Sequence, residues 1–137
     1  MKRETIMKIR ACKALQNISV RDLLRTERFQ KNMAAYLNAQ KEDRTSYIAS
    51  YMAMRKFGLP KGYKLPAHVV DRILDLSVEE FTEAYFEVIQ GVSDKSAAER
   101  MYISQLGQQA YNLTMAQIVC EEFPELEGEL IPKTNAS

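Results

Sequence analysis

The segment from Ser77 to Gly91 constrains the fold more than any other part of the chain, because it carries a complete set of helix signals. Ser77 and Glu80 have the spacing of a capping box, in which the two side chains satisfy free amide groups at a helix start. Apolar residues then recur at positions 81, 84, 85 and 88, and Gly91 is a residue that readily ends a helix. The pattern predicts an amphipathic helix over residues 77–91, which needs other helices to cover its apolar face.

Weaker signals of the same kind predict helices over residues 4–16, 19–25, 27–40, 45–57, 66–76 and, starting at Ser93 or Ser96, up to about Phe123. Only five glycines and four prolines interrupt the 137 residues, which also favours helices. We therefore predict an all-α, single-domain bundle of about six helices with a long C-terminal helix. The helical domain is expected to span residues 1–123, followed by an acidic flexible tail over residues 124–137.

The charge of the chain is divided between its two halves. Residues 1–68 contain 15 Lys and Arg against 5 Asp and Glu, a net charge of +10, whereas residues 69–137 contain 4 against 13, a net charge of −9. Three outcomes are open. The halves can pair with each other, copies of the chain can associate head to tail, or the basic half can bind a polyanion such as nucleic acid.

The apolar stripe that starts at Val20 shifts its phase after Leu24, which predicts a break near Thr26 with Thr26 as the cap of a second helix. If the helix continued instead, Arg21, Arg25 and Arg28 would form one basic ridge. The loop at residues 58–66 adds a tyrosine between lysines. The candidate residues for binding nucleic acid or an acidic partner are Arg21, Arg25, Arg28, Lys31, Lys61, Tyr63 and Lys64.

The helix over residues 77–91 carries an acidic ridge, because Glu79, Glu83 and Glu87 are spaced four residues apart. Like charges at this spacing repel one another weakly, and a nearby cation would relieve the repulsion. Glu79 also has a local role at the positive end of the helix dipole. The three glutamates are the candidate residues for contact with a basic partner.

The long C-terminal helix has two apolar stripes, which predicts that it packs against two neighbours. These are either helices of the same chain or another subunit. If one neighbour is a second copy, self-association would use residues of both stripes, namely Ile103, Leu106, Ala110, Leu113, Tyr111, Met115 and Ile118.

Signs of catalysis are missing from the sequence. The chain has one histidine, His68, and the two cysteines, Cys12 and Cys120, have neither metal nor redox spacing. No catalytic or phosphate-binding motif occurs, so we expect no enzyme activity, no cofactor and no metal. The apolar runs are too short for a membrane span, and the N-terminus does not resemble a signal peptide, which predicts a cytoplasmic protein.

These observations favour a non-catalytic assembly or adaptor protein that acts through segregated charged surfaces and associates with itself or with a larger complex. Small phage-like structural or accessory proteins have this general character. One alternative is a nucleic-acid-binding protein that uses the basic N-terminal half. The other is a small inhibitor or chaperone whose acidic half binds the basic groove of a partner.

Overall fold

The computed structural model describes residues 3–42, 57–60 and 62–131, and within them the chain is all-α. This confirms the predicted single-domain helical bundle, although the predicted helix at 45–57 lies almost wholly outside the described residues. The helical elements are α1 (Arg3–Ala11), η1 (Lys13–Leu15), α2 (Val20–Leu24), α3 (Glu27–Glu42), α5 (Ala67–Leu74), α6 (Val78–Gln90), α7 (Ala97–Leu106), η2 (Gly107–Tyr111), α8 (Asn112–Glu122), η3 (Pro124–Leu126) and α9 (Glu127–Leu130).

A capping box starts each of the helices α2 and α6, and backbone pairing joins the two helix starts. The hydroxyl of Ser19 accepts a hydrogen bond from the amide of Asp22 at 3.1 Å, and the hydroxyl of Ser77 accepts one from the amide of Glu80 at 3.1 Å. An isolated antiparallel bridge pairs Ser19 with Ser77. The two helices therefore begin side by side, held by backbone hydrogen bonds as well as by side-chain packing.

Thr26 separates α2 from α3, as the phase shift in the sequence predicts. Its hydroxyl donates to the carbonyl of Leu23 at 2.7 Å and accepts from the amide of Phe29 at 3.2 Å. Because the helix does not run through Thr26, the alternative of one continuous basic ridge is wrong.

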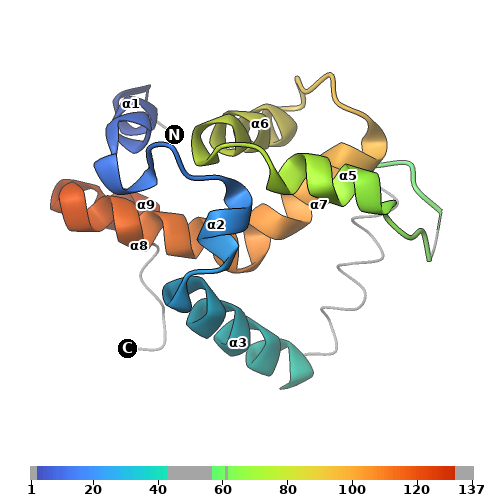
Figure 1. Ribbon diagram of the computed structural model, residues 1–137, viewed down its shortest axis with the longest axis horizontal. Coiled ribbons are helices and arrows are strands. Elements are labelled where there is room, and N and C mark those ends of the chain that lie inside the picture. Colours follow the sequence, from blue (N-terminus) through green and yellow to red (C-terminus); the bar gives the residue numbers. More distant parts are fainter. Residues whose placement is uncertain (1–2, 43–56, 61, 132–137) are drawn as a thin grey trace.

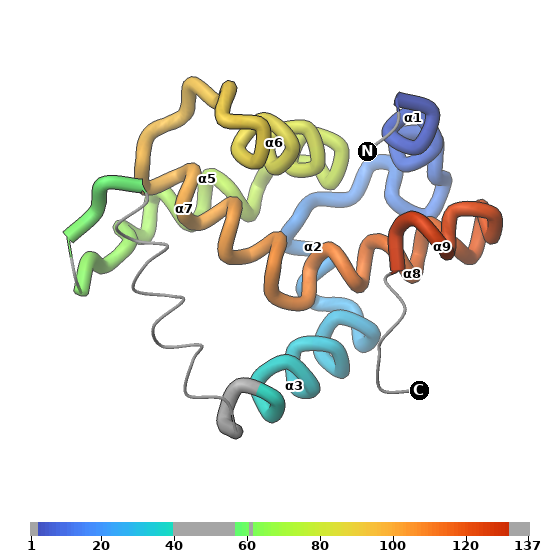
Figure 2. The backbone as a smooth tube through the Cα atoms, turned by 180° about the vertical axis from the view of Figure 1, so that it is seen from behind, coloured from blue at the N-terminus to red at the C-terminus, as the bar shows by residue number. Residues whose placement is uncertain are grey.

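Helix α7, the turn η2 and helix α8 run through the centre of the bundle (Figures 1 and 2). Helices α5 and α6 pack against α7, whereas α3 packs against η2 and α8. Helices α1 and α6 lie on one side of α8, and α3 lies on the other side (Figure 1).

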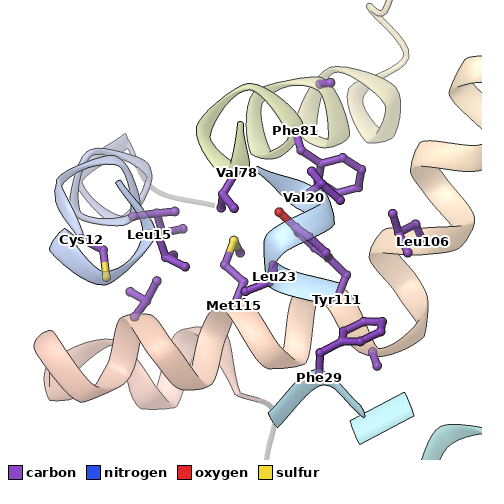
Figure 3. Close-up of a cluster of buried hydrophobic side chains, with 14 of the residues drawn as sticks. Cys12, Leu15, Val20, Leu23, Phe29, Val78, Phe81, Leu106, Tyr111 and Met115 are labelled. Carbon is purple, nitrogen blue, oxygen red and sulfur yellow. The ribbon is translucent and has the colours of Figure 1, made fainter. Parts of the chain in front are cut away.

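The core lies where α2, α6 and the central elements meet (Figure 3). Phe81 and Tyr111 are fully buried, and their ring centroids are 4.4 Å apart. Val20 and Leu23 of α2 are also fully buried. Burial of each large apolar side chain stabilises the fold by roughly 1.5–3 kcal/mol, so this cluster is the main source of cohesion between the elements.

The predicted long C-terminal helix is interrupted, which corrects the expectation of one continuous helix. Gly107–Tyr111 form a π-helical turn in which Gln109 has ψ −110°, outside the helical range. A π turn accommodates an extra residue and rotates the next helical segment about its axis. The core face therefore moves to the stripe of Tyr111 and Met115, and Leu113 of the other stripe is left 39% exposed.

The expected flexible tail also needs correction, because its first part is folded. Residues 124–131 contain η3 and α9, and Leu126 is only 5% exposed within the core. Polar contacts add to this anchoring, since Lys8 Nζ lies 3.1 Å from Glu125 Oε1 and Thr5 Oγ1 donates to Glu129 Oε2 at 2.7 Å. The acidic composition of residues 124–131 is typical of a solvated tail. Leu126 and Leu130 nevertheless supply enough apolar surface for this segment to pack against α8.

Candidate interaction surfaces

Within the described residues, four cationic side chains of the first half form ion pairs with carboxylates of the second half, namely Lys8, Arg10, Arg21 and Arg28. Arg21 Nη2 lies 3.2 Å from Asp75 Oδ1 and 3.4 Å from Asp71 Oδ1, and the hydrogen bond to Asp75 is the main reason that the pKa of Arg21 is raised. Arg28 forms an ion pair with Glu121. The charge division in the sequence is thus partly neutralised inside the molecule.

The candidate nucleic-acid residues that the structure describes are divided among α2, α3 and the loop before α5. Arg21 lies in α2 and Arg25 at its end, Arg28 and Lys31 lie in α3, and Lys64 is exposed in the loop before α5. Tyr63 in that loop is partly buried, and Lys61 lies outside the described residues.

A shallow depression of about 470 Å³ between α3 and α8 is the nearest feature to the expected basic site. Its cations are balanced, because Lys31 Nζ is 3.5 Å from Glu27 Oε1 and Arg28 has its Glu121 partner. Its amide groups are also occupied, since Asn32 Nδ2 donates to Gln117 Oε1 at 3.0 Å. Nucleic acid is bound by Lys and Arg side chains that displace the counterions of its phosphates. This depression offers little net positive charge for such binding.

The acidic ridge of α6 is exposed along its length. Glu79, Glu83 and Glu87 all face solvent, and Glu83 forms an ion pair with Arg10 of α1. In the described part of the chain, Glu79 and Glu87 make no ion pair. Two of the three ridge carboxylates therefore remain available to an outside cation.

An apolar groove adjoins this ridge, between α6, α8 and α9. It has a volume of about 200 Å³ and is lined by Thr82, Tyr85, Phe86, Ile89, Asn112, Met115, Ala116, Glu129 and Leu130. Thr82 and Phe86 each follow a ridge glutamate by three residues, so the groove and the ridge are neighbouring rows on the surface of α6. Ile89 is 59% exposed and is the most exposed apolar side chain among the residues that line the groove.

The sequence did not identify this groove. The sequence does contain a sign of the α6 wall of the groove. Phe86 and Ile89 are apolar, three residues apart, and lie outside the main stripe of Phe81, Ala84 and Val88. The other wall comes from α8 and α9, and the position of α9 is not evident from a segment whose composition predicts a tail.

The candidate self-association residues are mostly used inside the molecule. Five of them are buried in the core, namely Ile103, Leu106, Ala110, Tyr111 and Met115. Ile118 is partly buried against that core, and Leu113 is the most exposed of the set. A coiled-coil seam with a second copy would compete with the chain's own α2, α3 and α6.

Reactive side chains form no cluster in the described residues. No group of three His, Cys, Asp or Glu residues stands there in a position to hold a metal ion. His68 is exposed near the start of α5, and burial is the main cause that raises the pKa of both Cys12 and Cys120. The two thiols therefore favour the neutral form over the nucleophilic thiolate.

None of the helices in the described part of the chain combines the length and the apolar content of a membrane span. Comparison of the chain with protein-family models, with curated proteins and with solved structures gave no match.

Proposed function

We propose that this protein is a non-catalytic adaptor that binds a basic region of another protein through the acidic ridge of α6. The observation that supports this proposal is the exposed row of Glu79, Glu83 and Glu87, of which only Glu83 is paired with a cation in the described chain. Complementary charge of this kind speeds association and selects the partner, even where it adds little affinity.

The distribution of the other charges favours this surface over the basic half. Arg21 and Arg28, two central members of the expected cationic site, already have carboxylate partners from the second half of the chain. Binding of nucleic acid would require these ion pairs to break or to share their cations. The acidic ridge requires no such rearrangement at Glu79 and Glu87.

A quantitative pull-down tests the proposal. The purified protein is immobilised and incubated with extract of its source cells at low and at high salt, and the bound proteins are compared with those bound by the Glu79→Lys/Glu87→Lys variant. We expect a basic partner that the variant loses by about tenfold or more, and that the natural chain also loses at high salt.

Asp94→Lys is the matched control, because Asp94 is an exposed carboxylate outside α6. Circular dichroism should show the same helix content for all three proteins. The proposal is wrong if the double charge reversal on α6 and the Asp94 control retain the same bound proteins.

A further inference from the structure

We propose that the groove between α6, α8 and α9 receives the apolar side chains of a basic amphipathic helix from the partner. This inference rests on the proposed function and deepens it, since it specifies what kind of basic segment the acidic ridge selects.

The size of the groove limits what can occupy it. Its volume of about 200 Å³ is smaller than the roughly 300–1,000 Å³ of a typical small-molecule or cofactor site. It suits one or two large side chains that are attached to a partner lying across the surface. The exposed Ile89 at its edge gives such a partner apolar area outside the groove itself.

The walls of the groove are positioned by the core. Tyr85 packs against Gly107 of the π turn so closely that a Cβ atom at Gly107 would lie 2.4 Å from the Tyr85 ring. Met115 and Ala116 on the opposite wall are buried to 5% and 2% exposure. A site with walls of this kind exists before the partner arrives, which lowers the entropic cost of binding.

The charge around the groove indicates which side chains flank the apolar anchors of the occupant. None of its lining residues is cationic, and Glu129 contributes a carboxylate that accepts a hydrogen bond from Thr5. The adjoining row on α6 presents Glu79 and Glu87. An occupant with Lys or Arg beside its apolar anchors would meet the carboxylates of Glu79 and Glu87 along the α6 side of the groove.

The form of the occupant is set by the walls, which are helices. Helices satisfy their own backbone groups and offer no free edge to an extended peptide, whereas a second helix can lay an apolar row between two of them. The anchors on such a helix recur at spacings of three and four, as do Thr82, Tyr85, Phe86 and Ile89 on α6.

Binding of stapled helical peptides tests this inference by fluorescence anisotropy. Three labelled peptides of about 18 residues are compared, a length sufficient for a helix when stapled. The first has a Leu and Phe row flanked by lysines, the second has the same row flanked by glutamates, and the third keeps the lysines but has serines in the row. We expect saturable binding of the first peptide and at least about tenfold weaker binding of the other two.

Two pairs of variants locate the binding. Ile89→Ser should weaken binding of the first peptide by about tenfold, whereas Val92→Ser should not, because Val92 is equally aliphatic and 66% exposed but does not line the groove. Glu79→Lys/Glu87→Lys should also weaken it, and Asp94→Lys should not.

The outcomes separate this inference from the proposed function. If the charge reversal weakens binding but Ile89→Ser does not, the groove is not the site, although the acidic ridge still is. If Ile89→Ser weakens binding but the charge reversal does not, the groove takes apolar helices of any charge, and both the basic occupant and the proposed function are wrong. If light scattering shows a dimer that Ile89→Ser dissociates, a second copy fills the groove and the inference is overturned. Absence of saturable binding for all three peptides also overturns it.

Discussion

Tyr111 is the most unusual single residue of the core. Its side chain is fully buried, and its hydroxyl has no hydrogen-bond partner among the described residues. Burial raises its pKa, since the charged phenolate would be poorly solvated there. A buried hydroxyl without a partner costs stability, while the ring itself gains from packing against Phe81.

We expect Tyr111→Phe to raise the free energy of unfolding by about 1 kcal/mol, because it removes the unpaired hydroxyl and keeps the ring. Urea denaturation measures the change. Tyr111→Leu is the control, since it removes both groups and should destabilise the protein. A loss of stability in Tyr111→Phe would mean that the hydroxyl has a partner in solution.

The close contact between Gly107 and Tyr85 leads to a second prediction. Gly107 has helical backbone angles, so alanine would by propensity stabilise the helix by roughly 0.5–1 kcal/mol. The steric effect is larger, because the new Cβ would lie 2.4 Å from the Tyr85 ring, and overpacking of this kind costs typically about 1–3 kcal/mol. We expect Gly107→Ala to lower the melting temperature.

Gly128→Ala is the matched control for this change. Gly128 lies in α9, and a Cβ atom there would meet nothing within 4 Å. The control should be neutral or slightly stabilising. Equal effects of the two alanines on the melting temperature would contradict the steric explanation.

At the scale of elements, the sequence predicted most helix starts and stops, because these depend on local chemistry. Thr26 and Ser77 act as caps where the pattern placed them, and Gly91 ends α6 with φ 75°. The π turn at 107–111 could not be predicted in this way. Its first residue, Gly107, lies against the ring of Tyr85 of α6, and local sequence patterns do not encode such a tertiary contact.

The folded start of the predicted tail gives a prediction for a single leucine. Leu126→Ala should lower the free energy of unfolding by about 2–4 kcal/mol, because Leu126 is 5% exposed and its loss would leave a cavity beside α8. Leu113→Ala is the matched control, since Leu113 is 39% exposed and should cost much less. Chemical denaturation of both variants measures the difference. Similar small losses would show that residues 124–131 contribute little to the fold.

At the scale of the whole molecule, pairing between the two halves was one of the outcomes that the charge division left open, but the individual ion pairs could not be predicted. Composition gives the net charge of each half, whereas the contacts of Arg10 with Glu83 and of Arg28 with Glu121 depend on which helices become neighbours. For the same reason the acidic ridge was predicted from its spacing on one helix, and the groove beside it, which needs three elements, was not.

The carboxyl group of Glu125, which lies beside Lys8 of the first half, gives a prediction of how acid affects stability. The pKa of Glu125 is lowered, first by a backbone hydrogen bond and then by Lys8. A carboxyl group with a folded pKa below its unfolded value contributes stability at pH values above the unfolded pKa and loses this contribution as the pH falls. The melting temperature should therefore fall from about pH 6 to about pH 3.

The variant Glu125→Gln should show a smaller acid-induced loss than the natural chain, and Asp94→Asn should behave like the natural chain. Thermal melts followed by circular dichroism at several pH values make the comparison. If Glu125→Gln loses as much melting temperature as the natural chain over this range, the ionised carboxyl group does not stabilise the fold.

The hydrogen bond between Thr5 and Glu129 spans 124 positions of the chain. Helix α1 leaves the ribosome well before the residues that cover it in α6, η3 and α9. Until those residues are translated its apolar face, with Ile9, remains unprotected and is a candidate substrate for chaperones that bind nascent chains. We therefore expect the bundle to close only when η3 and α9 emerge and dock.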